Sequence, residues 1–267
     1  MKIKKILSHK VIKAGSWYAI TDLFLKGALF LTIPIFTRLL TPTDYGLVSL
    51  FTTWLSIFTI LISLNLNTSI TRAKYEFTDS FNQFVSSITF LSLLVFLLYL
   101  IIFSVFIDFF TSITGFSKIL FYFMVILAYF NFIKLSLVTK FRVEYKYKLI
   151  SLTSMVIVLS GILLSVFLIV FVFESNKFIG KILGDGIFTI LLGIFFLIYL
   201  LSKGKELINL SYWKYALLLS LPLILHSISG IVNGQFDRLI IDYYLGEAPV
   251  GIYSFAYNIG LIISVVL

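Results

Sequence analysis

The chain has 267 residues, of which 60% are apolar, 18% aromatic and only 12% charged. A globular protein is about 45–50% apolar and about 25% charged, so this chain lacks the polar residues that a water-soluble fold of its size needs for its surface. The absence of cysteine excludes disulfides, thiolate catalysis and cysteine-ligated metals. The composition therefore predicts a chain whose solvent is mostly lipid.

Long apolar runs are spread over the whole sequence, and four of them hold 22 or more consecutive residues without a charge. A helix needs about 20 apolar residues to cross a bilayer. The runs are continuous and not alternating, which favours helices over a barrel. We expect an all-α, polytopic membrane protein with eight spans, at residues 15–37, 45–66, 84–107, 119–139, 150–173, 178–201, 214–236 and 249–267.

The predicted spans form two groups. We expect residues 1–205 to form a six-span bundle, and residues 206–267 to hold spans seven and eight, the first two helices of a second, related bundle. The segments between spans are too short to bury a core of their own, so no soluble domain is expected. The last apolar run ends at Leu267 without a polar anchor, so we expect a fragment of a longer protein. Pairing of two such chains is the alternative.

The positive charge follows this topology. With eight spans, fifteen Lys and Arg residues fall on the side of the amino terminus and five on the other side. Basic residues in short loops favour the cytoplasmic side, so we expect a cytoplasmic amino terminus. Contact with anionic lipid then accounts for the net charge of +9, and no nucleic acid is expected as a partner. Residues 1–13 predict either a short amphipathic surface helix or a plain basic tail.

Ionisable residues inside the spans are candidates for function, because each costs about 2.5 kcal/mol or more in the bilayer and normally faces a partner or a water-filled cavity. In the first span, Asp22 and Lys26 lie one helical turn apart. They form either a charged cavity lining, with Lys26 binding an anionic substrate, or a self-neutralising pair. In the sixth span, Lys181 and Asp185 repeat this spacing near the outer end, where snorkelling to the interface is the alternative.

The seventh span carries a polar stripe at helical spacing. This stripe consists of His226, Ser229, Asn233 and Asp237. It is typical of a transporter's cavity wall, and interhelical hydrogen bonding is the alternative. Pro222 predicts a kink or hinge, and Arg238 follows the stripe at the start of the next loop. In the fourth span, interior packing and snorkelling explain Asn131 and Lys134.

Several kinds of chemistry have no motif in this sequence. The only histidine besides His226 is His9, so a His–carboxylate metal cluster is not expected. No stretch matches the phosphate-binding P-loop of ATPases. We therefore expect no metal, no cofactor and no enzymatic activity.

Two turn segments occupy matching places, after the first and the seventh span. Residues 37–46 read T-R-L-L-T-P-T-D-Y-G, in which Thr41 or Thr43 can cap the next helix, Pro42 suits its first turn and Gly46 permits close backbone approach. Residues 237–257 read D-R-L-I-I-D-Y-Y-L-G-E-A-P-V-G-I-Y-S-F-A-Y, with Pro249 at the start of a helix. Similar segments at matching places are expected of a protein built from two related halves.

In these two segments the chain resembles the polysaccharide biosynthesis (Wzx-type) transporters, the lipid-linked oligosaccharide flippases of the multidrug/oligosaccharidyl-lipid/polysaccharide exporter superfamily. The resemblance implies twelve to fourteen spans in two six-helix bundles that face each other across a cavity. It also implies export of polyprenyl-diphosphate-linked sugar repeat units across the bacterial inner membrane, for O-antigen or capsule. The implied partners are this lipid-linked oligosaccharide, the lipid bilayer, a polysaccharide polymerase and a chain-length regulator.

For this function we expect cations along the path of the diphosphate, with Lys26 first and Lys181 and Arg38 toward the outer side. One alternative is an ion-coupled multidrug exporter of the same superfamily, with Asp22 as the ion site. The other is a membrane-embedded polysaccharide polymerase or ligase, which the short outer loops disfavour. The substrate-path candidates are Asp22, Lys26, Arg38, Lys181, Asp185, His226, Ser229, Asn233, Asp237 and Arg238, with Pro222 as the hinge.

Overall fold

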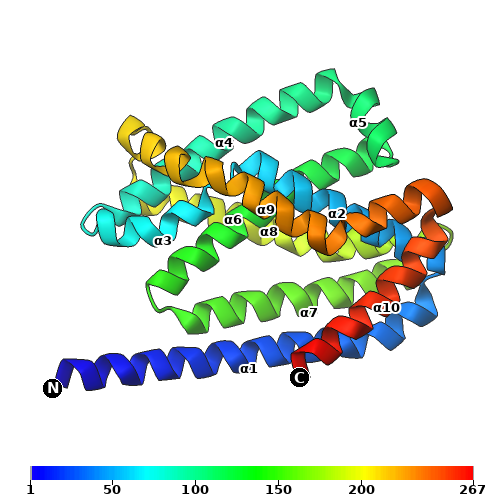
Figure 1. Cartoon of the computed structure of the whole chain (residues 1–267), viewed down its shortest axis with the longest axis horizontal. Helices are drawn as coiled ribbons and strands as arrows, with labels where there is room; N and C mark the ends of the chain where they lie inside the picture. The colour runs from blue at the N-terminus through cyan, green and yellow to red at the C-terminus, as the bar shows by residue number, and fades with distance from the viewer. Residues whose placement is uncertain (1, 267) are drawn as a thin grey trace.

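The computed structural model describes the backbone of residues 2–266 and the side chains of residues 15–260 except Lys26 and Leu29. Within this part of the chain the structure is helical and consists of ten α-helices joined by short turns (Figure 1). The helices are α1 (Lys2–Leu39), α2 (Pro42–Ser63), α3 (Asn67–Glu76), α4 (Phe81–Val105), α5 (Ile107–Thr114), α6 (Lys118–Val143), α7 (Tyr147–Phe171), α8 (Lys177–Gly204), α9 (Leu210–Leu245) and α10 (Glu247–Val266).

Seven of the described helices are long and apolar enough to cross a membrane. They are α1 from residue 15 onward, α2, α4, α6, α7, α8 and α9, and each coincides with one of the first seven predicted spans. The eighth predicted span corresponds to α10, whose side chains after residue 260 lie outside the described residues. The prediction of an all-α, polytopic membrane protein is confirmed.

The long helices run alongside one another, so that their turns gather at two ends of the molecule (Figure 1). One end holds the start of α1, helix α3 and the α6–α7 and α8–α9 turns; we call it the basic end, because the predicted loops with most of the lysines lie there. The opposite end holds the α1–α2 turn, helix α5 and the α9–α10 turn. The chain from residue 2 continues into α1 without a break, so residues 2–13 do not form a separate helix.

Helix α6 lies at the centre and is the most buried of the candidate spans. It packs against α2, α3 and α8, and its aromatic residues interlock with those of its neighbours. The rings of Phe58, Phe103 and Phe121, from three different helices, meet edge to face with centroids 5.4–5.6 Å apart. Such pairs are favourable beyond the area that they bury. This aromatic core joins α2, α4 and α6.

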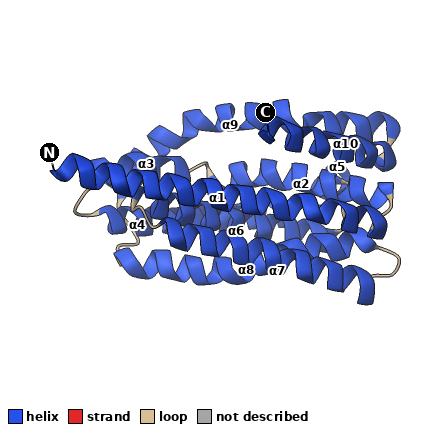
Figure 2. Ribbon diagram, turned by 90° about the horizontal axis from the view of Figure 1, so that it is seen from below, coloured by secondary structure: helices blue, strands red, loops and turns tan. Residues whose placement is uncertain are grey.

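The last two long helices form a layer of their own. Seen from below, α9 and α10 lie along one side of the molecule and α7 and α8 along the other, with α2 between them (Figure 2). Helix α2 contacts both α9 and α10, whereas α1 packs mainly along α7. The division into residues 1–205 and 206–267 stays a prediction.

Two details of the fold differ from the sequence analysis. Residues 67–76, expected in a loop, form α3, whose Ser69, Ile70 and Ala73 are buried against the core. Helix α9 continues to Leu245, so Asp237 and Arg238 lie inside a helix and not in the following loop. Their charges are accommodated within the membrane part because both side chains have partners on α10.

Candidate anion-binding cavity

The turn before α2 is held by its own side chains. Thr41 caps α2 in a capping box: its hydroxyl accepts from the backbone nitrogen of Asp44 at 3.1 Å, and the Asp44 carboxylate accepts from the backbone nitrogen of Thr41 at 3.0 Å. Pro42 follows at the first helical position. The second carboxylate oxygen of Asp44 accepts from the backbone nitrogen of Phe178, so one aspartate joins the starts of α2 and α8.

The two turn segments of the sequence analysis meet in space. A Cβ atom on Gly46 would overlap the carbonyl oxygen of Glu247, and one on Gly251 would overlap that of Pro42. The amide of Asn258 also donates to the hydroxyl of Tyr45 at 3.0 Å. Helices α2 and α10 therefore touch backbone to backbone at the opposite end, and the glycines make this crossing possible.

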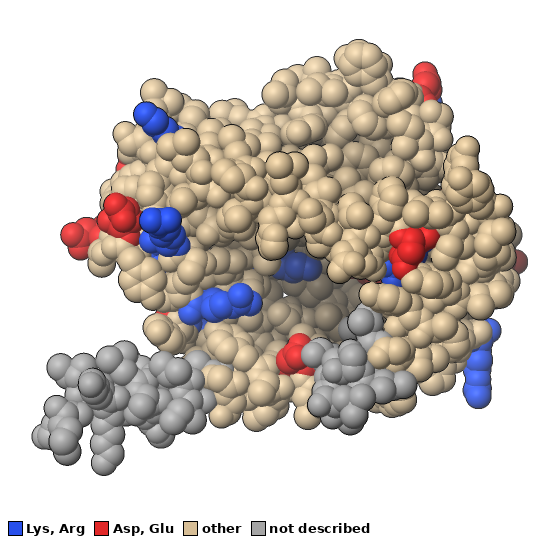
Figure 3. Space-filling view, viewed as in Figure 1, with Lys and Arg blue, Asp and Glu red and all other residues tan. Residues whose placement is uncertain are grey.

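Next to this crossing, and including Tyr45 and Asn258 in its lining, is a cavity of about 1080 Å³ lined by residues of α1, α2, α6, α7, α8, α9 and α10. We call it the central cavity. Figure 3 shows the face above α1 hollowed, with a basic group inside the hollow. Among the described residues, the charged ones that line it are Lys134, Lys181, Asp185 and Arg238, and the polar ones include Tyr45, Ser49, Thr52, Thr53, Asn131, Thr189, Gln235, Tyr257 and Asn258. Three cations therefore face one described carboxylate.

Lys181 and Asp185 form an ion pair along α8. The ammonium group also sits 4.3 Å from the centroid of the Phe36 ring, which is a cation–π contact. The hydroxyl of Ser165 on α7 donates to the other carboxylate oxygen of Asp185 at 3.0 Å. The side chain of Lys181 is 16% exposed and that of Asp185 47%, so the aspartate is the more accessible partner.

Arg238 is the most enclosed of the three cations, with a side chain that is 9% exposed. Its guanidinium donates to the hydroxyl of Ser254 and to the carbonyl of Gly234, each at 3.1 Å, and lies 5.0 Å from the Tyr257 ring centroid. The carboxylate of Asp237 is 4.0 Å away and is itself bound by the hydroxyl of Tyr253. Helix α10 thus holds the arginine against the cavity.

Lys134 lies on the wall that α6 contributes. Its ammonium group donates to the side-chain oxygen of Asn131 at 2.9 Å. Among the side chains that the structure describes, no carboxylate pairs with it. Asn131 and Lys134 both line the central cavity, and interior packing with snorkelling stays a prediction for them. The lone cation near mid-span was the signal that could have placed Lys134 among the candidates.

The other predicted residues lie in different places. The polar stripe of α9 does not line the cavity: His226, Ser229 and Asn233 are exposed, and the adjacent face with Gly234 and Gln235 forms the wall. Asp22 and Arg38 are exposed on α1 and are not among the residues that line the cavity, and Pro222 is exposed within the unbroken helix α9. The side chain of Lys26 lies outside the described residues. The structure thus brings together Lys181, Asp185 and Arg238.

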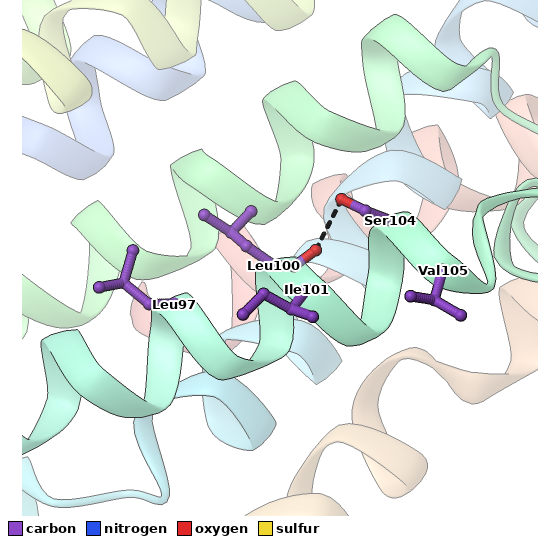
Figure 4. Close-up of a pocket in the computed structure, with 5 residues that line it drawn as sticks. All are labelled: Leu97, Leu100, Ile101, Ser104 and Val105. Carbon is purple, nitrogen blue, oxygen red and sulfur yellow. Dashed lines mark hydrogen bonds between the residues drawn. The ribbon is translucent and has the colours of Figure 1, made fainter.

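A second hollow lies on the lipid-facing side of α4. It is lined by Leu97, Leu100, Ile101, Ser104 and Val105, and the hydroxyl of Ser104 donates to the carbonyl oxygen of Leu100 at 2.7 Å (Figure 4). An apolar lining without charges suits hydrocarbon and cannot compensate a buried anion. The central cavity is therefore the candidate functional site.

Together, the spanning helices and the charged cavity are those of a multi-pass membrane protein with a polar space between its helices. Residues 11–267 match the model of the polysaccharide biosynthesis protein family, and the chain belongs to this family. A protein of the Lsg locus of Haemophilus influenzae is 25% identical over 264 residues, which are 97% of this chain and 63% of that protein. The chain thus spans less than two thirds of that relative's length. No solved structure matches the chain.

Proposed function

We propose that the chain is the cavity-forming part of a flippase that exports polyprenyl-diphosphate-linked oligosaccharide repeat units across the bacterial inner membrane, for O-antigen or capsule. The observation that carries this proposal is the central cavity, in which three cations face one described carboxylate between membrane-spanning helices. Membership of the polysaccharide biosynthesis family supports the substrate class.

The chemistry of the cavity suits such a head group. Moving a diphosphate, with about two negative charges, into an apolar medium without compensation is prohibitive. Lys134, Lys181 and Arg238 offset this cost, and Arg238 can offer its planar fork of donors to phosphate oxygens. Hydroxyl and amide groups along the lining suit sugars, as does the face of Tyr257. The polyprenyl tail stays in lipid.

The excess of basic residues supports a cytoplasmic amino terminus, so that the basic end faces the cytoplasm. Loading occurs from that side and release at the opposite end, by alternating access between the two bundles. Pro222 is the proposed hinge. Asp22, Arg38 and the stripe of His226, Ser229, Asn233 and Asp237 stay proposed path residues for other stages of the cycle. Lys26 stays a proposed cation on α1, whose Leu23 and Gly27 line the cavity.

The test replaces single lysines by mutating the chromosomal gene for this protein in its host cells. Lys134→Gln is expected to lower surface polysaccharide at least about tenfold, because a hydrogen bond to a charged group contributes about 1.5–3 kcal/mol. Lys26→Ala is expected to lower it as well. The matched control is Lys118→Gln, which removes a lysine at the far end of the same helix, where the side chain is 59% exposed.

Export is measured as surface polysaccharide per unit of membrane-inserted protein. Normal export from a well-inserted Lys134→Gln variant would contradict the proposal, and so would an equal loss in Lys118→Gln. Drug accumulation that depends on an ion gradient, with surface polysaccharide unaffected by all three changes, would favour the multidrug exporter instead.

A further inference from the structure

We propose that Asp185 is a built-in competitor for the anion at Lys181, which makes the head group leave the cavity at the opposite end. This inference rests on the proposed function, because it assumes that the cavity binds a diphosphate. The inference concerns release of the substrate. Asp185 is the single described carboxylate of the cavity lining, and a path made only of cations that attract the diphosphate would not need it.

The three cations of the cavity are compensated to different degrees. Lys134 has only the neutral oxygen of Asn131 as a described partner. Arg238 has mostly neutral partners around it; the nearest carboxylate oxygen, Oδ1 of Asp237, is 4.0 Å from the guanidinium, and the other oxygen accepts from Tyr253. Of the three, Lys181 has the closest carboxylate partner, Asp185, which also lines the cavity. An anion therefore meets the least resistance at Lys134 and a competitor at Lys181.

These cations also lie at different depths. At 1.5 Å per residue, Lys134 is about 14 Å from the end of α6 at the basic end. Lys181 is about 6 Å from the start of α8 and Arg238 about 10 Å from the end of α9, both measured from the opposite end. Lys134, which has no carboxylate partner among the described side chains, is thus nearest the basic end, and the carboxylate of Asp185 acts where the head group has to leave.

The surroundings of the pair allow an exchange of partners. Phe36 faces the ammonium group of Lys181 and Ser165 holds the carboxylate of Asp185, so each charge has a second contact when the ion pair opens. A phosphate that binds Lys181 takes the place of Asp185 and lies near its negative charge. Like charges a few ångströms apart repel strongly in a medium of low dielectric. Asp185 therefore weakens the bound state and closes the pair again after the anion has left.

The experiment measures binding of inorganic pyrophosphate to the purified chain in lipid nanodiscs, at one fixed salt concentration. Asp185→Asn is expected to bind at least about tenfold more tightly, which corresponds to about 1.4 kcal/mol, and to export less surface polysaccharide in cells. Asp185→Ser, a second neutral variant, is expected to behave alike. Asp185→Glu retains the carboxylate and is expected to bind as the wild type does.

The matched control is Asp108→Asn, which removes the carboxylate of an exposed lysine pair at the same end but outside the cavity. It is expected to change neither binding nor export. Unchanged or weaker binding by both neutral variants overturns the inference, and so does normal export from a variant that binds tightly. A wild-type chain that binds no pyrophosphate overturns the proposed function as well, so the two failures can be told apart.

Discussion

Two lysine–carboxylate pairs with the same four-residue spacing occupy opposite kinds of environment. Lys140 and Glu144, at the basic end of α6, are 2% and 14% exposed, and Lys140 also donates to the side-chain oxygen of Asn82 at 2.8 Å. Lys181 and Asp185 on α8 are 16% and 47% exposed and line the central cavity. The first pair is the more enclosed of the two and does not line the cavity, whereas the second opens to a space that an anion can enter.

The comparison separates a structural charge from a functional one. In the closed pair every charge has fixed partners, including Lys146, which also bonds Glu144. Removing one partner there leaves a largely enclosed charge with fewer partners, which costs stability. In the open pair a substrate can replace a partner, so its removal changes binding more than folding. Access to the cavity, and not the spacing of the residues, makes the difference.

The largest effect on export is expected from a substitution at the crossing of α2 and α10, two of the helices that line the cavity. Gly46→Leu drives a side chain into the backbone of Glu247, so α10 cannot approach α2 and export is expected to be lost. Gly230→Ala is the matched control, since nothing lies within 4 Å of its new methyl group. Surface polysaccharide and inserted protein are measured in parallel. Export retained by Gly46→Leu would contradict this role of the crossing.

Replacing Lys140 and Lys181 separately by methionine tests the difference between the closed and the open pair. Lys140→Met is expected to destabilise the protein by about 1.5–3 kcal/mol, because Glu144, only 14% exposed, loses one of its two lysine partners. Lys181→Met is expected to leave stability within about 1 kcal/mol, because Asp185 is half exposed, and to impair export instead. Unfolding of the purified variants in detergent measures the first effect. Equal loss of stability in both variants would remove the distinction.

Most of the fold could be predicted from the sequence because lipid imposes a simple rule. Helices such as α4 and α7 need about 20 apolar residues, and their runs are uninterrupted. Helix α3 was missed because its ten residues are mostly polar and only tertiary contacts bury Ile70 and Ala73. The predicted end of α9 was wrong because an arginine after an apolar run indicates a loop. The contacts of Arg238 with Ser254 and Tyr257, which stabilise it within the helix, come from α10 and are not visible in the sequence pattern.

The cavity was harder to predict for a geometric reason. Helical periodicity relates residues of one helix to each other but does not say which face meets a neighbour. The stripe of α9 was recognised, yet the described cavity touches the adjacent face with Gln235. Lys134 looked like a snorkelling residue because its surroundings come from helices far away in the sequence. Lys181, Asp185 and Arg238 were found because their charges alone made them exceptional.

The smallest effect concerns the pH dependence of the closed pair. Burial raises the pKa of Glu144, but hydrogen bonds from Lys140 and Lys146 outweigh it and hold the pKa below 4.5. A lowered pKa stabilises the fold above the unfolded value, and this contribution is lost as the pH falls through the folded value. Glu144→Gln is therefore expected to cost on the order of 1 kcal/mol at pH 7.

This cost should shrink as the pH falls below 4.5, and thermal unfolding at several pH values measures it. Asp108→Asn, in an exposed pair, is the control and is expected to change stability little. A cost that stays constant or grows on acidification would contradict the closed arrangement of Glu144.

The most direct test of the wet, anion-binding cavity uses the absence of native cysteine. A single Gln235→Cys change places a thiol on the cavity wall, and Ser104→Cys places one in the apolar hollow of α4 as a control. A charged, water-soluble thiol reagent is expected to label the Gln235→Cys variant quickly. Pyrophosphate is expected to slow this labelling. The Ser104→Cys variant is expected to react slowly, with or without pyrophosphate. A Gln235→Cys variant that stays unlabelled, or that pyrophosphate does not protect, would contradict an aqueous cavity that receives a diphosphate.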